Sequence, residues 1–149
     1  MLSQIKRFFE KEDIRIKQSY EILDSLRLPH GLYLASSSQQ YNYVWIRDSV
    51  YMSLPYANKD CNTYEKAFHR LFDLFKEYEW KIDFCIEKRP HFEWEYIHAR
   101  YQAQTVTEVA EEWGHIQNDM IGAFLYGVGL GLEHGKPMFR DLKDSEILQ

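Results

Sequence analysis

The sequence predicts an all-α domain with four or five helices. Apolar residues recur at steps of three and four over several stretches, most clearly between Tyr64 and Tyr78, and this is the period of one helix face. Residues that end or kink helices, such as Pro29, Gly31 and Pro55, separate these stretches. A length of 149 residues fits a single domain with one core. We therefore expect residues 1–149 to form one helical domain.

The first two helices are expected at residues 3–27 and from about Ile46. The first has an apolar stripe and stops at the Pro-His-Gly sequence of residues 29–31. A polar loop at residues 36–40 follows it. Pro55 is expected to kink or end the second helix.

The third helix has the strongest signal in the chain. Asn62 is expected to cap it, with Glu65 three residues later as in a capping box. Its apolar face consists of Tyr64, Ala67, Phe68, Leu71, Leu74, Phe75 and Tyr78.

The second half of the chain gives a less regular pattern. Pro90 and the alternating aromatic residues after it favour an extended segment or loop within residues 82–101. A short helix is expected at residues 105–112 and a long one at residues 115–132. Residues 136–149 are expected to form a polar tail with a final turn.

Composition excludes several classes of function. A net charge of −5 argues against a nucleic-acid partner. The amino terminus has no long apolar run, so neither a signal peptide nor a membrane anchor is expected. The two cysteines and six histidines show no metal-ligand spacing, and the cysteines form no disulfide framework. We therefore expect no metal, no cofactor and a cytoplasmic protein.

The strongest functional motif runs from Tyr41 to Asp48. Three aromatic residues, Tyr41, Tyr43 and Trp45, alternate just before the adjacent Arg47 and Asp48, and in an extended segment they would point the same way. Aromatic faces stack on pyranose rings, and Arg and Asp form charge-assisted hydrogen bonds to sugar hydroxyls. The alternative is an Arg47–Asp48 ion pair at a helix start, where the helix dipole favours the acid.

A second motif, Trp113 to Asp119, has a similar order of aromatic and polar residues. Gln117 and Asn118 are poor choices for a helix interior but good ones for a first turn. If they are buried they need polar partners, and a hydroxyl-rich ligand would supply them. Capping and ligand binding are both consistent with this pattern.

The two motifs also give the chain a resemblance to a known family. The segments that carry it are residues 31–36, 41–48, 97–101 and 113–119, with Trp-x-Arg-Asp and Trp-Gly-x-x-Gln-x-Asp in this order. In them the chain resembles the amino-terminal part of the glucoamylase and glucodextranase family of glycoside hydrolases. The regulatory α and β subunits of phosphorylase kinase share this domain. The resemblance extends over residues 14–133.

This resemblance implies a partial (α/α)₆ barrel, or toroid. The family fold has six helical hairpins around a central pocket, and four or five helices make roughly a third of it. The chain is therefore expected to be a fragment of the family domain, either a truncated product or a short member. An apolar face would be exposed where further helices belong, which predicts self-association or a partner chain that completes the barrel.

The resemblance also implies a set of substrate-binding residues. Trp45, Arg47 and Asp48 match the subsite that holds the terminal glucose, and Tyr41 matches a tyrosine close to the reacting centre. Among the remaining matches, Trp113 corresponds to a pocket tryptophan and Gln117 to a nearby binding residue. His115 stands where fungal glucoamylases have a substrate-binding arginine.

The resemblance assigns no catalytic residue to this chain. Family members hydrolyse α-glucosidic bonds with inversion, which needs an acid and a base about 6.5–9.5 Å apart. Both family glutamates lie beyond the Trp-Gly-x-x-Gln-x-Asp segment, and the acidic residues after Asp119 lack their context. Glu111 and Glu112 precede Trp113, so they match neither position.

The sequence thus predicts a glycoside hydrolase domain that retains part of an α-glucan pocket. Its expected ligand is an α-glucan or maltooligosaccharide, and an intact parent would perform inverting exo-hydrolysis. Two alternatives remain. One is a non-enzymatic regulatory module, as in the kinase subunits, and the other is an assembly domain completed by another chain.

Overall fold

The structure is a computed structural model that describes residues 2–111 and 116–149. It is mostly helical, which confirms the predicted fold class, an all-α partial toroid. Its α-helices are α1 (Leu2–Leu26), α2 (Ile46–Ser53), α3 (Cys61–Glu77), α4 (Glu79–Glu87), α5 (Asp119–Glu133) and α6 (Leu142–Glu146). Short 3₁₀ helices are η1 (Gln39–Tyr41), η2 (Leu54–Tyr56) and η3 (Glu93–Glu95).

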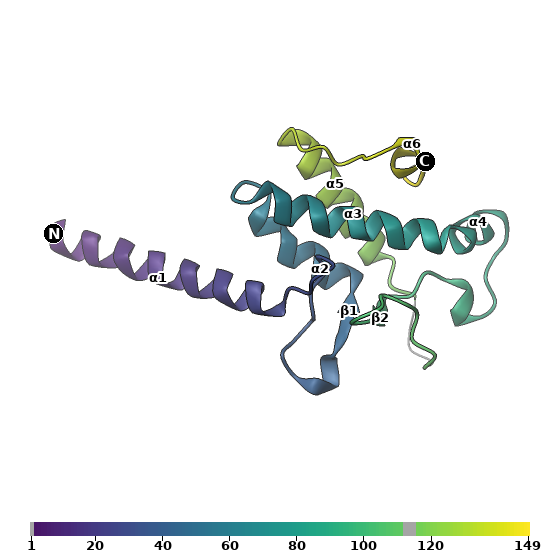
Figure 1. Cartoon of the computed structure of the whole chain (residues 1–149), viewed down its shortest axis with the longest axis horizontal. Helices are drawn as coiled ribbons and strands as arrows, with labels where there is room; N and C mark the ends of the chain where they lie inside the picture. Colours follow the sequence, from purple (N-terminus) through teal and green to yellow (C-terminus); the bar gives the residue numbers. More distant parts are fainter. Residues whose placement is uncertain (1, 112–115) are drawn as a thin grey trace.

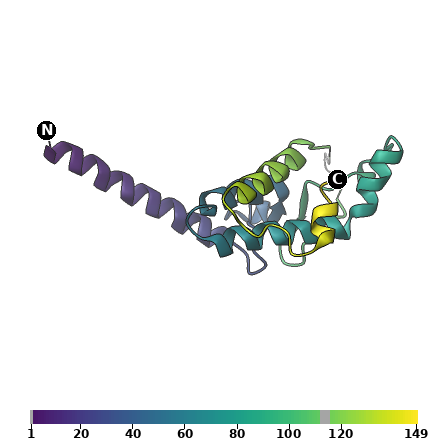
Figure 2. The same ribbon diagram turned by 90° about the horizontal axis from the view of Figure 1, so that it is seen from above.

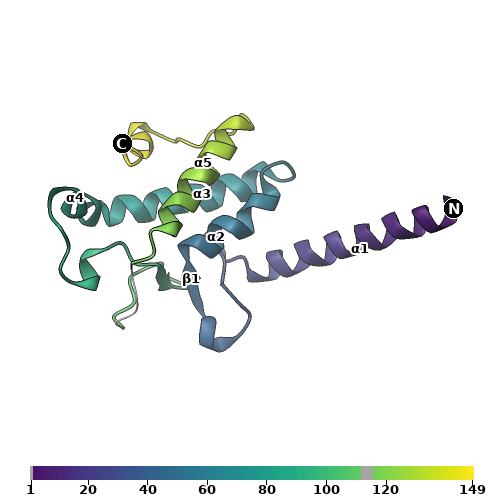
Figure 3. The ribbon, with the colours of Figure 1, turned by 180° about the vertical axis from the view of Figure 1, so that it is seen from behind.

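Helices α2, α3 and α5 pack together around the core, and α1 projects away from the other elements (Figures 1 and 3). Seen from above, α1 again extends well beyond the rest of the molecule (Figure 2). None of the described helices is both long and apolar enough to cross a bilayer.

The core is built on the apolar face of α3. The Tyr64 hydroxyl donates a hydrogen bond of 2.5 Å to the backbone oxygen of Gly127 on α5. A Cβ atom at Gly127 would lie 2.2 Å from the Phe68 ring, so glycine permits this close approach of the two helices. The apolar period of α3 therefore predicts correctly which face of this helix packs in the core.

The predicted cap of α3 is wrong by two residues. Asp60, rather than Asn62, is the N-cap, and its carboxylate accepts a hydrogen bond of 3.3 Å from the backbone N–H of Thr63. Aspartate is as good a cap as asparagine, so the local sequence offered two caps of similar quality. Helix α2 begins at Ile46 as predicted, and Pro55 lies in the 3₁₀ turn that follows it.

A small antiparallel sheet is the main addition to the predicted fold. Strand β1 (Tyr43–Trp45) pairs with β2 (Arg100–Gln102), and Trp45 lies opposite Arg100. The backbone N–H of Ile46 then donates to the oxygen of Ala99 at 3.2 Å. This sheet connects the start of α2 to a segment more than fifty residues later in the chain.

Three predicted boundaries also differ from the structure. Residues 82–87, expected to be extended or a loop, belong to α4. The helix predicted at 105–112 does not form over residues 105–111, because this stretch turns back to pair with β2. Val106 has a φ of 57° in that turn, and Tyr101 bridges to Glu108. The long helix begins at Asp119.

The last residues pack on the body of the molecule. Residues 136–149, expected as a polar tail with a final turn, contain α6 and place Met138 in the core. The fully buried carboxylate of Asp144 accepts hydrogen bonds from Lys76 and Arg140 at 2.6 and 2.9 Å. Burial opposes its ionisation, but these hydrogen bonds hold the pKa of Asp144 well below its usual range.

Candidate functional site

The first motif lies where β1 passes into α2. Val44 and Ile46 are fully buried, and the alternating residues Tyr43 and Trp45 are only partly covered. Tyr41 lies just before the strand, at the end of η1, and is exposed. The alternation thus buries Val44 and Ile46 and leaves Tyr43 and Trp45 partly accessible, with Trp45 also packed against the core.

Four of the predicted binding residues surround one open hollow, which we call the first hollow. Its volume is about 330 Å³. Its lining consists of Ala35, Ser36, Tyr41, Trp45, Arg47 and Asp48. The hollow has two rings, one cation and one carboxylate, which is a suitable set of groups for a polyhydroxyl ligand.

Arg47 connects the two sequence motifs. Its guanidinium donates a hydrogen bond of 2.6 Å to the carboxylate of Asp119, the first residue of α5. This hydrogen bond raises the pKa of Arg47 and lowers the pKa of Asp119. The alternative of a helix-start ion pair with Asp48 is therefore not what forms, because the partner of Arg47 belongs to the second motif.

Asp48 is left half-buried at the edge of the first hollow. Burial raises the pKa of its carboxyl, although the nearby charge of Arg47 acts in the opposite direction. A carboxylate in this position gains from hydrogen-bond donors that a ligand supplies. Asp48 is therefore suited to accept hydrogen bonds from hydroxyl groups.

The second motif is only partly described. Trp113 and His115 lie outside the described residues. Gln117 is partly buried, two residues before α5, and does not belong to the lining of the first hollow. The backbone N–H of Met120 donates to the oxygen of Gln117 at 3.2 Å, so Gln117 takes part in the turn that starts α5.

Arg100 is a site residue that sequence reasoning missed. Its guanidinium carbon lies 4.6 Å from the centre of the Tyr43 ring and 6.0 Å from that of Trp45. The same side chain forms an ion pair of 3.2 Å with Glu111. Arg100 belongs to a segment that carries the family resemblance, but its place across the sheet from Trp45 depends on the pairing of β1 with β2.

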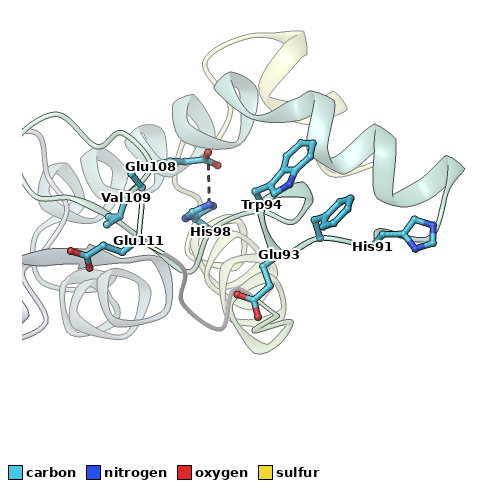
Figure 4. Close-up of a pocket in the computed structure, with 9 residues that line it drawn as sticks. His91, Glu93, Trp94, His98, Glu108, Val109 and Glu111 are labelled. Carbon is cyan, nitrogen blue, oxygen red and sulfur yellow. Dashed lines mark ion pairs between the residues drawn. The ribbon is translucent and has the colours of Figure 1, made fainter.

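A second hollow of about 640 Å³ is lined in part by Glu111, the ion-pair partner of Arg100 (Figure 4). Its lining consists of His91, Phe92, Glu93, Trp94, His98, Glu108, Val109, Ala110 and Glu111. Glu108 pairs with the buried ammonium group of Lys81, and its other oxygen lies 3.8 Å from Nε2 of His98. In the part of the chain that the structure describes, no group of three acidic, histidine or cysteine side chains could hold a metal ion.

Comparison with known family models shows which family the chain belongs to. The family model described as Glycosyl hydrolases family 15 matches residues 22–145. The chain belongs to this family. The resemblance inferred from the motifs is thereby confirmed, and the match includes β1, β2 and every described residue of the two hollows. No curated protein and no solved structure matches the chain.

Membership in glycosyl hydrolases family 15 identifies the general chemistry. The chain is a glycoside hydrolase-family domain, and the ligand class of such domains is carbohydrate. The first and second hollows are therefore candidate places for a sugar, because each has at least one exposed ring beside a carboxylate.

Proposed function

We propose that this chain binds the terminal glucose unit of an α-glucan in the first hollow. One observation carries the proposal: Tyr41, Trp45, Arg47 and Asp48 line a single hollow in a chain of glycosyl hydrolases family 15. The ring faces of Tyr41 and Trp45 would stack on the sugar. Asp48 would accept hydrogen bonds from its hydroxyls, and Arg47 would donate them.

The pair between Arg47 and Asp119 supports this arrangement. A guanidinium has five N–H donors, so the single hydrogen bond to Asp119 leaves donors for a ligand. Asp119 also restricts the rotamers of Arg47 before the sugar arrives, which lowers the entropy cost of binding. In this proposal Asp119 is a positioning residue.

The proposed parent reaction is inverting exo-hydrolysis of α-glucosidic bonds. Among the described residues, one carboxylate, Asp48, lines the first hollow, whereas inversion needs two. We therefore assign binding to this chain. The acid and base would come from other helices of the family barrel, in the same polypeptide or in a partner.

Titration with maltose tests the proposal, with the quenching of tryptophan fluorescence as the signal. We expect dissociation constants in the millimolar range. Asp48→Asn should weaken binding by about tenfold or more, because it weakens hydrogen bonds to a charged group. Trp45→Ala should weaken binding by about tenfold as well, because it removes a stacking ring. Affinity should also fall at acidic pH, and from a higher pH than for an ordinary aspartate, because burial raises the pKa of Asp48.

Tyr126→Phe is a suitable control, because this exposed residue on α5 lines neither hollow. Unchanged affinity in Trp45→Ala and Asp48→Asn, with the same pH profile as the wild-type chain, would contradict the assignment of the first hollow.

A second candidate function is that of a regulatory or assembly module. Helix α5 supports it, because several large apolar residues on its outer face are exposed. These residues are Ile121, Leu125, Tyr126 and Leu132. Such a face commonly marks an interaction surface. The two functions are compatible, since none of these four residues lines the first hollow.

A further inference from the structure

Three exposed aromatic rings form a cluster beside the second hollow. Trp80 is 50% exposed, Phe92 60% and Trp94 56%. The rings of Phe92 and Trp94 are nearly parallel, at 11° with centres 6.1 Å apart, and the Trp80 ring lies 6.4 Å from Trp94. We call these three residues the aromatic platform. Large rings grouped in water are unfavourable by themselves and indicate a binding surface.

The backbone beneath the aromatic platform is fixed by Glu95. Its carboxylate accepts hydrogen bonds from the backbone N–H groups of His91 and Phe92, at 2.6 and 2.8 Å. These hydrogen bonds lower the pKa of Glu95, so it stays ionised and keeps them. The aromatic platform therefore has a preorganised backbone, which reduces the entropy that a ligand would have to remove.

The wall of the second hollow shows which ligand chemistry the aromatic platform suits. Phe92 and Trp94 share that hollow with three glutamates, Glu93, Glu108 and Glu111, and with two histidines (Figure 4). The cations beside this wall, Lys81 and Arg100, already pair with Glu108 and Glu111, which leaves little to attract a phosphorylated or otherwise anionic ligand. A wall this polar also fits a folded protein partner poorly, since the buried centre of such interfaces is depleted in charge. Rings beside hydrogen-bond acceptors match a neutral polyhydroxyl chain.

The second hollow is next to the first through a single residue. Arg100 lies over Tyr43 and near Trp45, which lines the first hollow, and pairs with Glu111, which lines the second. A polymer whose end occupies the first hollow can therefore continue past Arg100 toward Trp94.

We propose that the aromatic platform and the second hollow form a second carbohydrate site, which binds glucose units of a glucan beyond the one in the first hollow. The inference rests on the proposed function for its ligand, but it concerns different residues. Trp94 and Phe92 contact the sugar faces, and Glu93 and Glu111 accept hydrogen bonds from its hydroxyls.

The test compares a short and a long ligand by calorimetric titration. Maltose can occupy the first hollow, and maltoheptaose can reach both. We expect the wild-type chain to bind maltoheptaose more tightly than maltose. Trp94→Ala should weaken the binding of maltoheptaose by about three- to tenfold, the usual value of one aromatic stacking contact, and leave the affinity for maltose unchanged. Trp94→Tyr keeps a ring and should retain most of the affinity.

Asp48→Asn separates the two proposals, because it should lower the affinities for maltose and maltoheptaose by the same factor. If Trp94→Ala binds maltoheptaose like the wild-type chain while Asp48→Asn weakens it, the second site is refuted and the first stands. If Trp94→Ala weakens maltoheptaose while Asp48→Asn changes neither ligand, the second site stands and the first is refuted. If Trp94→Ala does not fold, Phe92→Ala takes its place, with Tyr126→Phe as the control.

Discussion

The ion pair between Arg47 and Asp119 is the contact that joins the two sequence motifs, and its strength can be measured. Arg47→Ala and Asp119→Ala each remove one partner, and the double variant removes both. We expect the double variant to lose less stability than the two single variants combined, because each single change already abolishes the pair.

The structure allows the coupling free energy between Arg47 and Asp119 to be estimated. The Nη1–Oδ2 distance of 2.6 Å is short, but the side chains are 38% and 55% exposed. Water therefore screens the charges, and the pair should contribute about 0.5–1 kcal/mol, the upper part of the range for exposed pairs. Asp119→Ala should cost about 0.3–1 kcal/mol more than Arg47→Ala, because Asp119 also interacts with the dipole of α5.

Urea unfolding of the four proteins at 0.05 M and 1 M NaCl provides the assay. The coupling should fall at high salt, where the screening length drops to about 3 Å. The exposed pair Lys17–Glu21, at 3.9 Å, is a matched control and should show coupling of about 0.3 kcal/mol or less. Single-variant effects that add within error at 0.05 M NaCl would refute the view that Asp119 holds Arg47.

Two further predictions concern stability and assembly. Asp144→Asn should lower the free energy of unfolding by about 2–3 kcal/mol at pH 7, because it removes a buried charge that Lys76 and Arg140 bind. The pKa of Asp144 is lower in the folded chain, so this loss of unfolding free energy should shrink as pH falls below about 4. The exposed control Glu146→Gln should change the free energy of unfolding little. A loss in Asp144→Asn that does not depend on pH would contradict this account. If the exposed face of α5 binds a second copy, light scattering should detect oligomers that Leu125→Glu dissociates, whereas a wild-type monomer at all concentrations would exclude self-association.

Much of the helical fold could be predicted because its determinants are local. Helix α3 follows from an apolar period that continues for four turns, and Pro55 marks the end of α2. The β1–β2 sheet could not be predicted in this way, because each three-residue strand is defined by a partner far along the chain. The helix expected after residue 104 failed for the same reason, since the backbone of Gln102 pairs with that of Thr107.

The candidate site shows the same division between local and long-range information. The motif from Tyr41 to Asp48 is contiguous, so the sequence alone brings its residues together, and their role in binding stays a prediction. Arg100 and the aromatic platform lie far from this motif in the sequence, and no local pattern places them beside it. They take their places through the sheet and through the backbone hydrogen bonds of Glu95. The long-range part of the proposed site therefore depends on tertiary contacts.

The different surroundings of Arg47 and Asp48 favour ligand binding over a purely structural role for these two residues. Two adjacent opposite charges at a helix start could have neutralised each other locally. Instead Arg47 binds Asp119, and Asp48 stays half-buried with a raised pKa, which means that its charge is less stable in the folded chain than in water. Such a carboxylate reduces stability at neutral pH, and groups with this property are concentrated at functional sites. A sugar hydroxyl that donates to Asp48 would offset that loss, so binding should stabilise the chain and lower the pKa of Asp48 together.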